Sequence, residues 1–179
     1  MYIVDKIKHF SVNCNGYRVN NMRKLLIYLD TSFISYLEQE DVPEKKYETN
    51  ELWFMFQKRK DVDLIVSTVT FTEIDNCNEP KRTLLLERMS ENNLTIVKET
   101  DDDYQLSKLY LTKNILSNKS FDDLRHIAIA VNHNCNYILS WNFKHFVNPK
   151  TINAINSLNK EYNLPEIRIL PPSMMLGGF

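Results

Sequence analysis

Glycine and long apolar runs are scarce in this sequence of 179 residues, and each shortage excludes a class of protein. The three glycines form neither a G-x-G-x-x-G fingerprint nor a Walker A loop, which argues against dinucleotide and P-loop nucleotide binding. No apolar run approaches the length of a membrane span, so no membrane association is expected. The N-terminus lacks a compact apolar segment with a small-residue cleavage site, so a secretory signal is not expected either.

Cysteine number and net charge indicate the cellular compartment and the kind of nucleic-acid binding that the protein can have. The cysteines are Cys14, Cys77 and Cys135, an odd number without C-x-x-C spacing. This usage fits reduced thiols, so we expect a cytoplasmic protein without a disulfide framework. A formal net charge of -1 argues against a protein that coats nucleic acid non-specifically. It does not exclude an enzyme that binds nucleic acid through a local patch.

A predicted strand that runs directly into a helix organises the rest of the chain. Residues 25–29 are an unbroken apolar run, which is typical of a strand buried on both faces of a parallel sheet. Asp30, Thr31 and Ser32 end this run with residue types that favour helix N-caps, and apolar residues follow at helical spacing. Asp30 is therefore predicted at the carboxyl end of a buried strand, the edge at which open α/β sheets bind ligands.

The alternation of apolar runs and helical patterns continues along the chain. Further strands are predicted at 64–66, 94–97, 137–140 and 167–170. Helices are predicted at about 50–60, from Thr70, from Pro80, and at 101–116, 120–133 and 149–162. Strands that alternate with helices predict an α/β fold, a three-layer α/β/α sandwich with a mostly parallel central sheet of about five strands.

Two segments carry expectations beyond this alternation. Residues 1–21 are a weakly periodic polar stretch, which we predict to be a dispensable N-terminal extension of a single domain at 22–179. The predicted helix at 50–60 contains five consecutive apolar residues, from Leu52 to Phe56. One core-facing stripe cannot bury all five, so we expect one or two of them to contact a partner protein.

Three acids and an amide are predicted to meet at one edge of the sheet. Asp30, Glu73 and Asn142 each follow a predicted strand, and Asp123 begins a helix beside them. Taken singly, each is explained as a helix cap, and Thr70-x-x-Glu73 has the spacing of a capping box. Taken together, the three carboxylates would repel one another unless a cation lay among them, and hard oxygen ligands favour Mg²⁺ or Mn²⁺. Such a site suits phosphodiester hydrolysis, because a metal lowers the pKa of a water molecule and shields charge in the transition state.

Four segments of the chain carry a likeness to a known family. They are Ile-Tyr-Leu-Asp30-Thr-Ser, Ser-Thr-Val-Thr-Phe-Thr-Glu73-Ile, Asp123-Leu-Arg-His-Ile-Ala-Ile-Ala and Ile-Leu-Ser-Trp-Asn142-Phe-Lys-His. In this order they resemble a PIN domain, and in particular the VapC-type toxins of bacterial toxin–antitoxin pairs. The resemblance implies a metal-dependent ribonuclease that acts on RNA, a cognate antitoxin and a homodimer. It implies Asp30 and Asp123 as principal metal ligands and Glu73 as the third acid.

The resemblance also bears on the neighbours of these acids. Many PIN domains have an aspartate where this chain has Asn142, and the missing charge counts against a second metal. The spacing to His-Ile-Ala selects Asp123 rather than Asp122 as the ligand. The candidates for supporting contacts to metal-bound water or RNA phosphates are Thr31, Ser32, Arg125, Lys144 and His145. For Thr31 and Ser32, helix capping is an equally good explanation. His126 and Trp141 are expected to be packing residues.

Two other functions are compatible with the same residues. The first is a degenerate PIN-like module that binds RNA or protein without cutting. Asn142, an amide where many PIN domains have an acid, is the residue that supports this alternative. The second is a small-molecule phosphohydrolase with an aspartate nucleophile. That class is expected to carry an Asp-x-Asp pair, and Asp30-Thr-Ser32 lacks the second acid.

Overall fold

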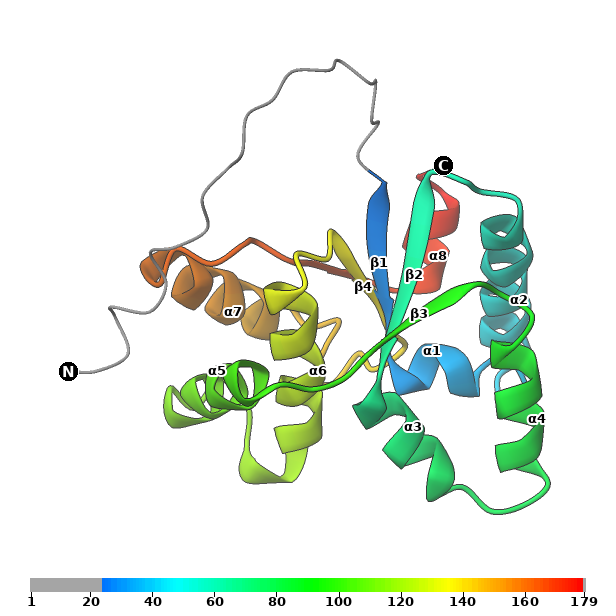
Figure 1. Cartoon of the computed structure of the whole chain (residues 1–179), viewed down its shortest axis with the longest axis horizontal. Helices are drawn as coiled ribbons and strands as arrows, with labels where there is room; N and C mark the ends of the chain where they lie inside the picture. The colour runs from blue at the N-terminus through cyan, green and yellow to red at the C-terminus, as the bar shows by residue number, and fades with distance from the viewer. Residues whose placement is uncertain (1–23, 179) are drawn as a thin grey trace.

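A five-stranded parallel sheet forms the centre of the protein, seen here in a computed structural model that describes residues 24–178 (Figure 1). The strand order is β3-β2-β1-β4-β5. The strands are β1 (Leu25–Leu29), β2 (Val62–Ser67), β3 (Leu94–Val97), β4 (Tyr137–Leu139) and β5 (Arg168–Leu170). This sheet confirms the predicted α/β fold. The predicted extension at 1–21 lies outside the described residues.

Helices cover both faces of the sheet and complete the three layers. On one face lie α5 (Asp101–Thr112), α6 (Phe121–Asn132) and α7 (Pro149–Glu161). On the other lie α1 (Thr31–Ser35), α2 (Pro43–Gln57), α4 (Lys81–Met89) and α8 (Pro172–Leu176). Two further elements are α3 (Thr68–Asp75) and the 3-10 turn Asn118–Ser120. Figure 1 shows the two helical groups on either side of the strands.

Side chains point alternately to the two faces of each strand, so the interior contains two apolar cores, one on each face of the sheet. Tyr28 and Ile65 are paired across β1 and β2, and both pack with the helices α5–α7. Ile27 and Leu64, one residue earlier on the same strands, pack with α1, α2 and α4 instead. Because successive side chains of a strand point to opposite faces, both faces of β1 and β2 must be apolar. This requirement explains why residues 25–29 form an unbroken apolar run.

Two helices differ most from the prediction, and both begin with proline. Helix α2 begins at Pro43, about seven residues before the predicted start, because proline at the first position of a helix needs no backbone donor. Helix α8, for which no helix was predicted, follows β5 directly and also begins with a proline, Pro172.

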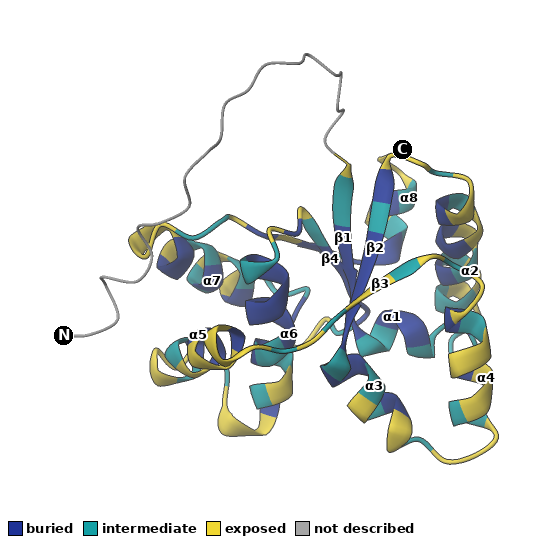
Figure 2. Cartoon of the chain, in the orientation of Figure 1, coloured by how far each residue is buried: buried dark blue, intermediate teal, exposed yellow. Residues whose placement is uncertain are grey.

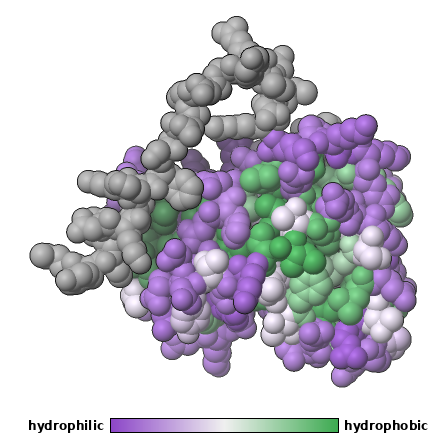
Figure 3. All heavy atoms as spheres, viewed as in Figure 1, coloured by the Kyte–Doolittle hydropathy of each residue, from purple (hydrophilic) through white to green (hydrophobic). Residues whose placement is uncertain are grey.

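The five apolar residues of α2 divide between the core and the surface. Leu52, Trp53 and Phe56 are buried, whereas Phe54 is 47% exposed. Figure 2 shows buried and exposed stretches alternating along α2. On β3, an edge strand, Ile96 is 59% exposed. Figure 3 shows apolar residues gathered on the face of the molecule that carries β3. Among the residues that the structure describes, no helix is long and apolar enough to cross a membrane.

Candidate active site

Asp30 lies at the carboxyl end of β1 and caps helix α1, as the sequence predicts. Its Oδ1 accepts a hydrogen bond from the backbone N–H of Phe33 at 2.8 Å. The hydroxyl of Ser140, which follows β4, donates to Oδ2 at 2.8 Å, and Ser32 donates to both oxygens. Because β4 is the neighbour of β1 in the sheet, Ser140 reaches Asp30 from 110 residues away in sequence.

Asp30 is a buried acid whose hydrogen-bond donors are neutral groups. The residue is 3% exposed. Burial raises the pKa of its carboxyl from 3.8 to about 6, although the hydrogen bond from Phe33 and the charge of His126 oppose the rise. The folded protein therefore has to hold a charge on Asp30 at neutral pH at a cost in stability.

Glu73 lies on α3, just beyond the end of β2, and contacts a buried histidine. His126 Nε2 lies 2.9 Å from Glu73 Oε2, and the hydroxyl of Thr31 also donates to Oε2. Burial raises the pKa of Glu73, but the hydrogen bond and charge of His126 outweigh it and hold the pKa below its ordinary value. Because α3 begins at Thr68 with Ser67 as its N-cap, the capping box predicted for Thr70 and Glu73 is wrong.

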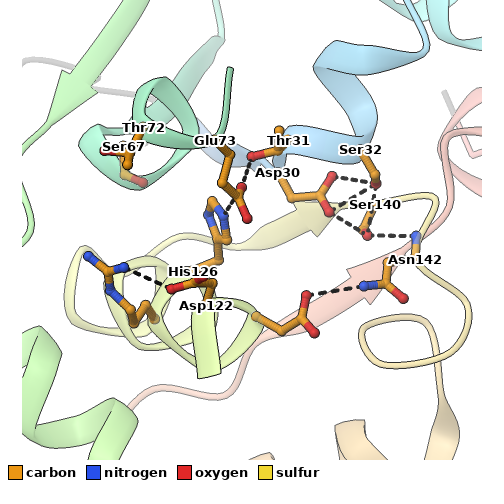
Figure 4. Close-up of polar contacts among 12 residues, drawn as sticks. Asp30, Thr31, Ser32, Ser67, Thr72, Glu73, Asp122, His126, Ser140 and Asn142 are labelled. Carbon is orange, nitrogen blue, oxygen red and sulfur yellow. Dashed lines mark hydrogen bonds and ion pairs between the residues drawn. The ribbon is translucent and has the colours of Figure 1, made fainter. Parts of the chain in front are cut away.

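A chain of buried hydrogen bonds fixes the ring of His126. The hydroxyl of Tyr28 on β1 lies 2.6 Å from His126 Nδ1 and 2.6 Å from the hydroxyl of Ser67 on β2. Tyr28 thus contacts Nδ1 of the ring, and Glu73 contacts Nε2. This chain couples Glu73 to the interior of the sheet, and Figure 4 shows its last contact, between His126 and Glu73.

Asp123, in the first turn of α6, is held by two polar side chains. Asn142 Nδ2 donates to Asp123 Oδ1 at 3.1 Å, and His145 Nδ1 lies 2.7 Å from Oδ2. The Oδ1 of Asn142 accepts from the backbone N–H of His145. Burial raises the pKa of Asp123, the hydrogen bond of His145 opposes this, and the charge of Glu73 adds to the rise. Asn142 therefore presents its amide nitrogen, not its oxygen, to the neighbouring acid.

The other predicted site residues lie in different surroundings. Asp122 points away from Asp123 and pairs with Arg125 at 2.8 Å. Both carboxylate oxygens of Glu99 also accept from the Arg125 guanidinium, at 2.7 and 2.6 Å. Reaching an RNA phosphate would therefore require Arg125 to leave two acids. Lys144 is exposed on the turn after Asn142.

The overall arrangement resembles three solved structures of bacterial toxins and their complexes. VapC20 of Mycobacterium tuberculosis, a toxin that cleaves the sarcin–ricin loop, matches with a TM-score of 0.54 and 15% identity, over 66% of this chain and 92% of VapC20. VapBC2 from Rickettsia felis, bound to a DNA fragment from its promoter, matches with a TM-score of 0.53 and 12% identity, over 82% of this chain and 98% of the matched chain. DNA-bound VapBC from Salmonella typhimurium matches with a TM-score of 0.50 and 12% identity, over 83% of this chain and 98% of the matched chain. The chain has a VapC-like PIN-domain fold. No family profile and no curated protein matches the sequence itself.

The contacts that two histidines of this PIN-like fold make with the acids were not predicted. The prediction that His126 is a packing residue is right for its burial, because only 2% of the residue is exposed, but it overlooked the contact with Glu73. His126 lies three positions after Asp123 on α6, so both side chains share one helix face. That spacing was the available signal. His145 was expected to meet RNA and instead pairs with Asp123, which lies 22 positions away.

The donor set of the PIN-like fold suits a divalent cation chemically. Asp30, Glu73 and Asp123 supply only carboxylate oxygens, the ligands that Mg²⁺ and Mn²⁺ prefer. Within residues 24–178, however, no three acid, histidine or cysteine side chains already stand in an arrangement that could hold a metal. Glu73 and Asp123 each face a histidine instead. Binding a cation therefore requires these carboxylates to share or exchange their histidine partners.

Proposed function

We propose that this protein is a metal-dependent endoribonuclease, the toxin of a toxin–antitoxin pair, acting in the cytoplasm. The observation that carries the proposal is that Asp30 and Glu73, just beyond β1 and β2, share a histidine-lined edge of a VapC-like fold with Asp123, whose pKa is raised by burial and by the charge of Glu73. Asp30 and Asp123 are the proposed principal ligands of Mg²⁺ or Mn²⁺, and Glu73 is the third acid. The bound cation would lower the pKa of a water molecule and shield charge on the scissile phosphate.

The residues around the acids have separate proposed roles. Ser32 and Ser140 hold the Asp30 carboxylate in one orientation, because both hydroxyls donate to it. His126 positions Glu73, and Asn142 positions Asp123. Each of these partners is itself held by a further contact, so the acids are pre-oriented at the sheet edge.

Incubation of the purified protein with labelled RNAs in Mg²⁺, Mn²⁺ or EDTA tests the proposal. Cleavage is expected with either metal and is expected to stop in EDTA. Single-stranded and loop segments are the expected targets, because sequence-specific recognition of RNA is concentrated there. Cleavage that persists in EDTA after dialysis would contradict the metal dependence.

A module that binds RNA without cutting it is the second candidate. The observation that favours it is that Glu73 and Asp123 both hydrogen bond to histidines, and Asn142 adds an amide rather than a charge. Binding of RNA with the same affinity in EDTA and in Mn²⁺, without any cleavage product, would favour this module over the nuclease.

Asn142→Asp distinguishes a positioning amide from a missing metal ligand. Without metal, the substitution places a second carboxylate about where an amide now lies 3.1 Å from Asp123, so we expect a lower melting temperature. With Mn²⁺, the added charge attracts the cation. Unit charges about 4 Å apart interact by roughly 4 kcal/mol at an effective dielectric of about 20, before desolvation is subtracted. We expect at least tenfold tighter Mn²⁺ binding by calorimetry, about 1.4 kcal/mol.

Asn142→Ala is the matched control, because it removes the amide donor without adding a charge. It should lower the melting temperature and leave Mn²⁺ affinity unimproved. Equal Mn²⁺ affinity in Asn142→Asp and Asn142→Ala would contradict the placement of residue 142 beside the cation.

An antitoxin and a second copy of the chain are the proposed protein partners. Leu84 and Leu86 on α4 are exposed, so this helix retains apolar surface that a partner could cover. Two of the similar structures are VapBC complexes, which supports an antitoxin partner. Light scattering that shows a monomer at micromolar concentration would contradict the homodimer.

A further inference from the structure

Three aromatic side chains form a row beside the acids. Tyr36 follows α1, and Trp141 and Phe143 follow β4. The ring centroids of Tyr36 and Trp141 are 6.0 Å apart, and those of Trp141 and Phe143 are 6.1 Å apart. Trp141 is buried, and its Nε1 donates to the hydroxyl of Thr49 at 2.8 Å. Phe143, at the end of the row, is 49% exposed.

A single lysine lies over all three rings. Lys45 Nζ is 4.8 Å from the ring centroid of Tyr36, 5.3 Å from that of Trp141 and 5.7 Å from that of Phe143. Between residues 24 and 178, no acid forms an ion pair with Lys45, although its neighbour Lys46 pairs with Glu40. The aromatic faces therefore hold a half-buried positive charge in place and leave it available to an anion.

The aromatic row is joined to the acidic edge by its own backbone. The N–H of Trp141 donates to Ser32 at 2.7 Å, and Ser32 in turn donates to Asp30. Asn142, between Trp141 and Phe143, contacts Asp123. The segment from Trp141 to Phe143 therefore connects the proposed metal ligands to an exposed aromatic ring that has a lysine beside it.

We propose that Phe143 and Lys45 form a subsite for one nucleotide of single-stranded RNA. The base stacks on the exposed ring of Phe143, and Lys45 contacts the adjoining phosphate. This inference rests on the proposed ribonuclease function and adds how the substrate is held next to the acids. An exposed aromatic ring beside a lysine that donates to the Tyr36 hydroxyl at 3.4 Å, and that no acid of residues 24–178 neutralises, provides the two contacts that proteins use to bind unpaired nucleotides.

Phe54 offers a matched control elsewhere on the surface. Its exposed fraction, 47%, is nearly that of Phe143, and a cationic group, the guanidinium of Arg88, lies 5.8 Å from its ring. Helix α2 carries Phe54 about two turns beyond Lys45, away from the residue that joins the row to the acids. The two phenylalanines therefore differ mainly in their position relative to Asp30 and Asp123.

The test is binding of short RNAs that carry 2-aminopurine at single positions, measured in EDTA so that the RNA stays intact. For the full chain, fluorescence should be quenched at one position, because the base stacks on Phe143. Phe143→Leu should lose the quenching and weaken binding about tenfold, whereas Phe143→Tyr should retain both. Lys45→Gln should weaken binding and reduce the salt dependence by about one phosphate contact. Phe54→Leu should match the unchanged protein.

Several outcomes would overturn the subsite. Unchanged quenching and affinity in Phe143→Leu would do so, and so would equal losses in Phe143→Leu and Phe54→Leu. If the protein cuts RNA in Mg²⁺ but its affinity for RNA in EDTA is too low to measure, the KM for cleavage is compared instead. Only Phe143→Leu and Lys45→Gln should then raise the KM. If Phe143→Leu fails to fold, Lys45→Gln and Phe143→Tyr test the subsite, and unchanged binding by Lys45→Gln would contradict it. A full chain that neither binds nor cuts RNA defeats the proposed function itself, and the subsite with it.

Discussion

Asp123→Asn is expected to reduce metal-dependent RNA cleavage by at least about 100-fold, which corresponds to roughly 2.7 kcal/mol of transition-state stabilisation. The substitution removes one charge from the proposed cation site while keeping nearly the same shape, so the fold should persist. Asp30→Asn should have a comparable effect, because it removes the other principal ligand. Initial rates at saturating Mg²⁺, with circular dichroism to check folding, provide the measurement.

Asp122→Asn is the control for this prediction, because it changes the same residue type one position away. Asp122 is exposed and pairs with Arg125, whereas Asp123 contacts Asn142 and His145. Cleavage by Asp122→Asn should stay within about threefold of the unchanged protein, less than 1 kcal/mol. If the two substitutions reduced cleavage equally, the assignment of Asp123 as the ligand would be wrong.

Asp30→Asn is also expected to stabilise the metal-free protein at neutral pH. The folded pKa of Asp30 is about 6, above the ordinary 3.8, so between these values the folded chain keeps a proton that the unfolded chain has released. The unfolding free energy therefore falls as the pH rises through this window. A shift of about two units corresponds to roughly 3 kcal/mol, an upper limit because asparagine replaces one acceptor oxygen with a donor. We expect a gain of about 1–2 kcal/mol at pH 7.5.

Urea denaturation at several pH values in EDTA measures this effect. The stability difference between Asp30→Asn and the unchanged protein should be smallest near pH 4 and should grow up to about pH 7. Saturating Mg²⁺ should narrow it, because only the charged Asp30 attracts the cation. A difference that stays constant with pH would show that Asp30 does not titrate in this range.

The sequence predicted the positions of the acids better than their contacts. Asp30 and Glu73 were placed correctly beyond their strands, because a buried strand that ends in polar residues is a local pattern. The pairing of Glu73 with His126 joins residues 53 positions apart and depends on how α3 and α6 approach each other. Local patterns do not contain that information. The start of α2 was missed for a different reason, since the helix was predicted only from about residue 50 and begins at Pro43.

The role of Asn142 was also beyond the sequence. From its residue type, either end of the amide could face the site. The structure shows that the oxygen accepts from the backbone of His145 and leaves the nitrogen to face Asp123. The orientation of an amide is set by its surroundings, which only the folded arrangement defines.

The separation of 110 positions between Asp30 and Ser140 has a consequence for protein synthesis. Strand β1 lies between β2 and β4, so its second neighbour is translated late, after α6. Until β4 leaves the ribosome, Asp30 lacks the hydroxyl of Ser140, and Asp123 lacks both Asn142 and His145. A nascent chain therefore cannot complete these contacts of Asp30 and Asp123 until β4 and the turn that follows it have left the ribosome.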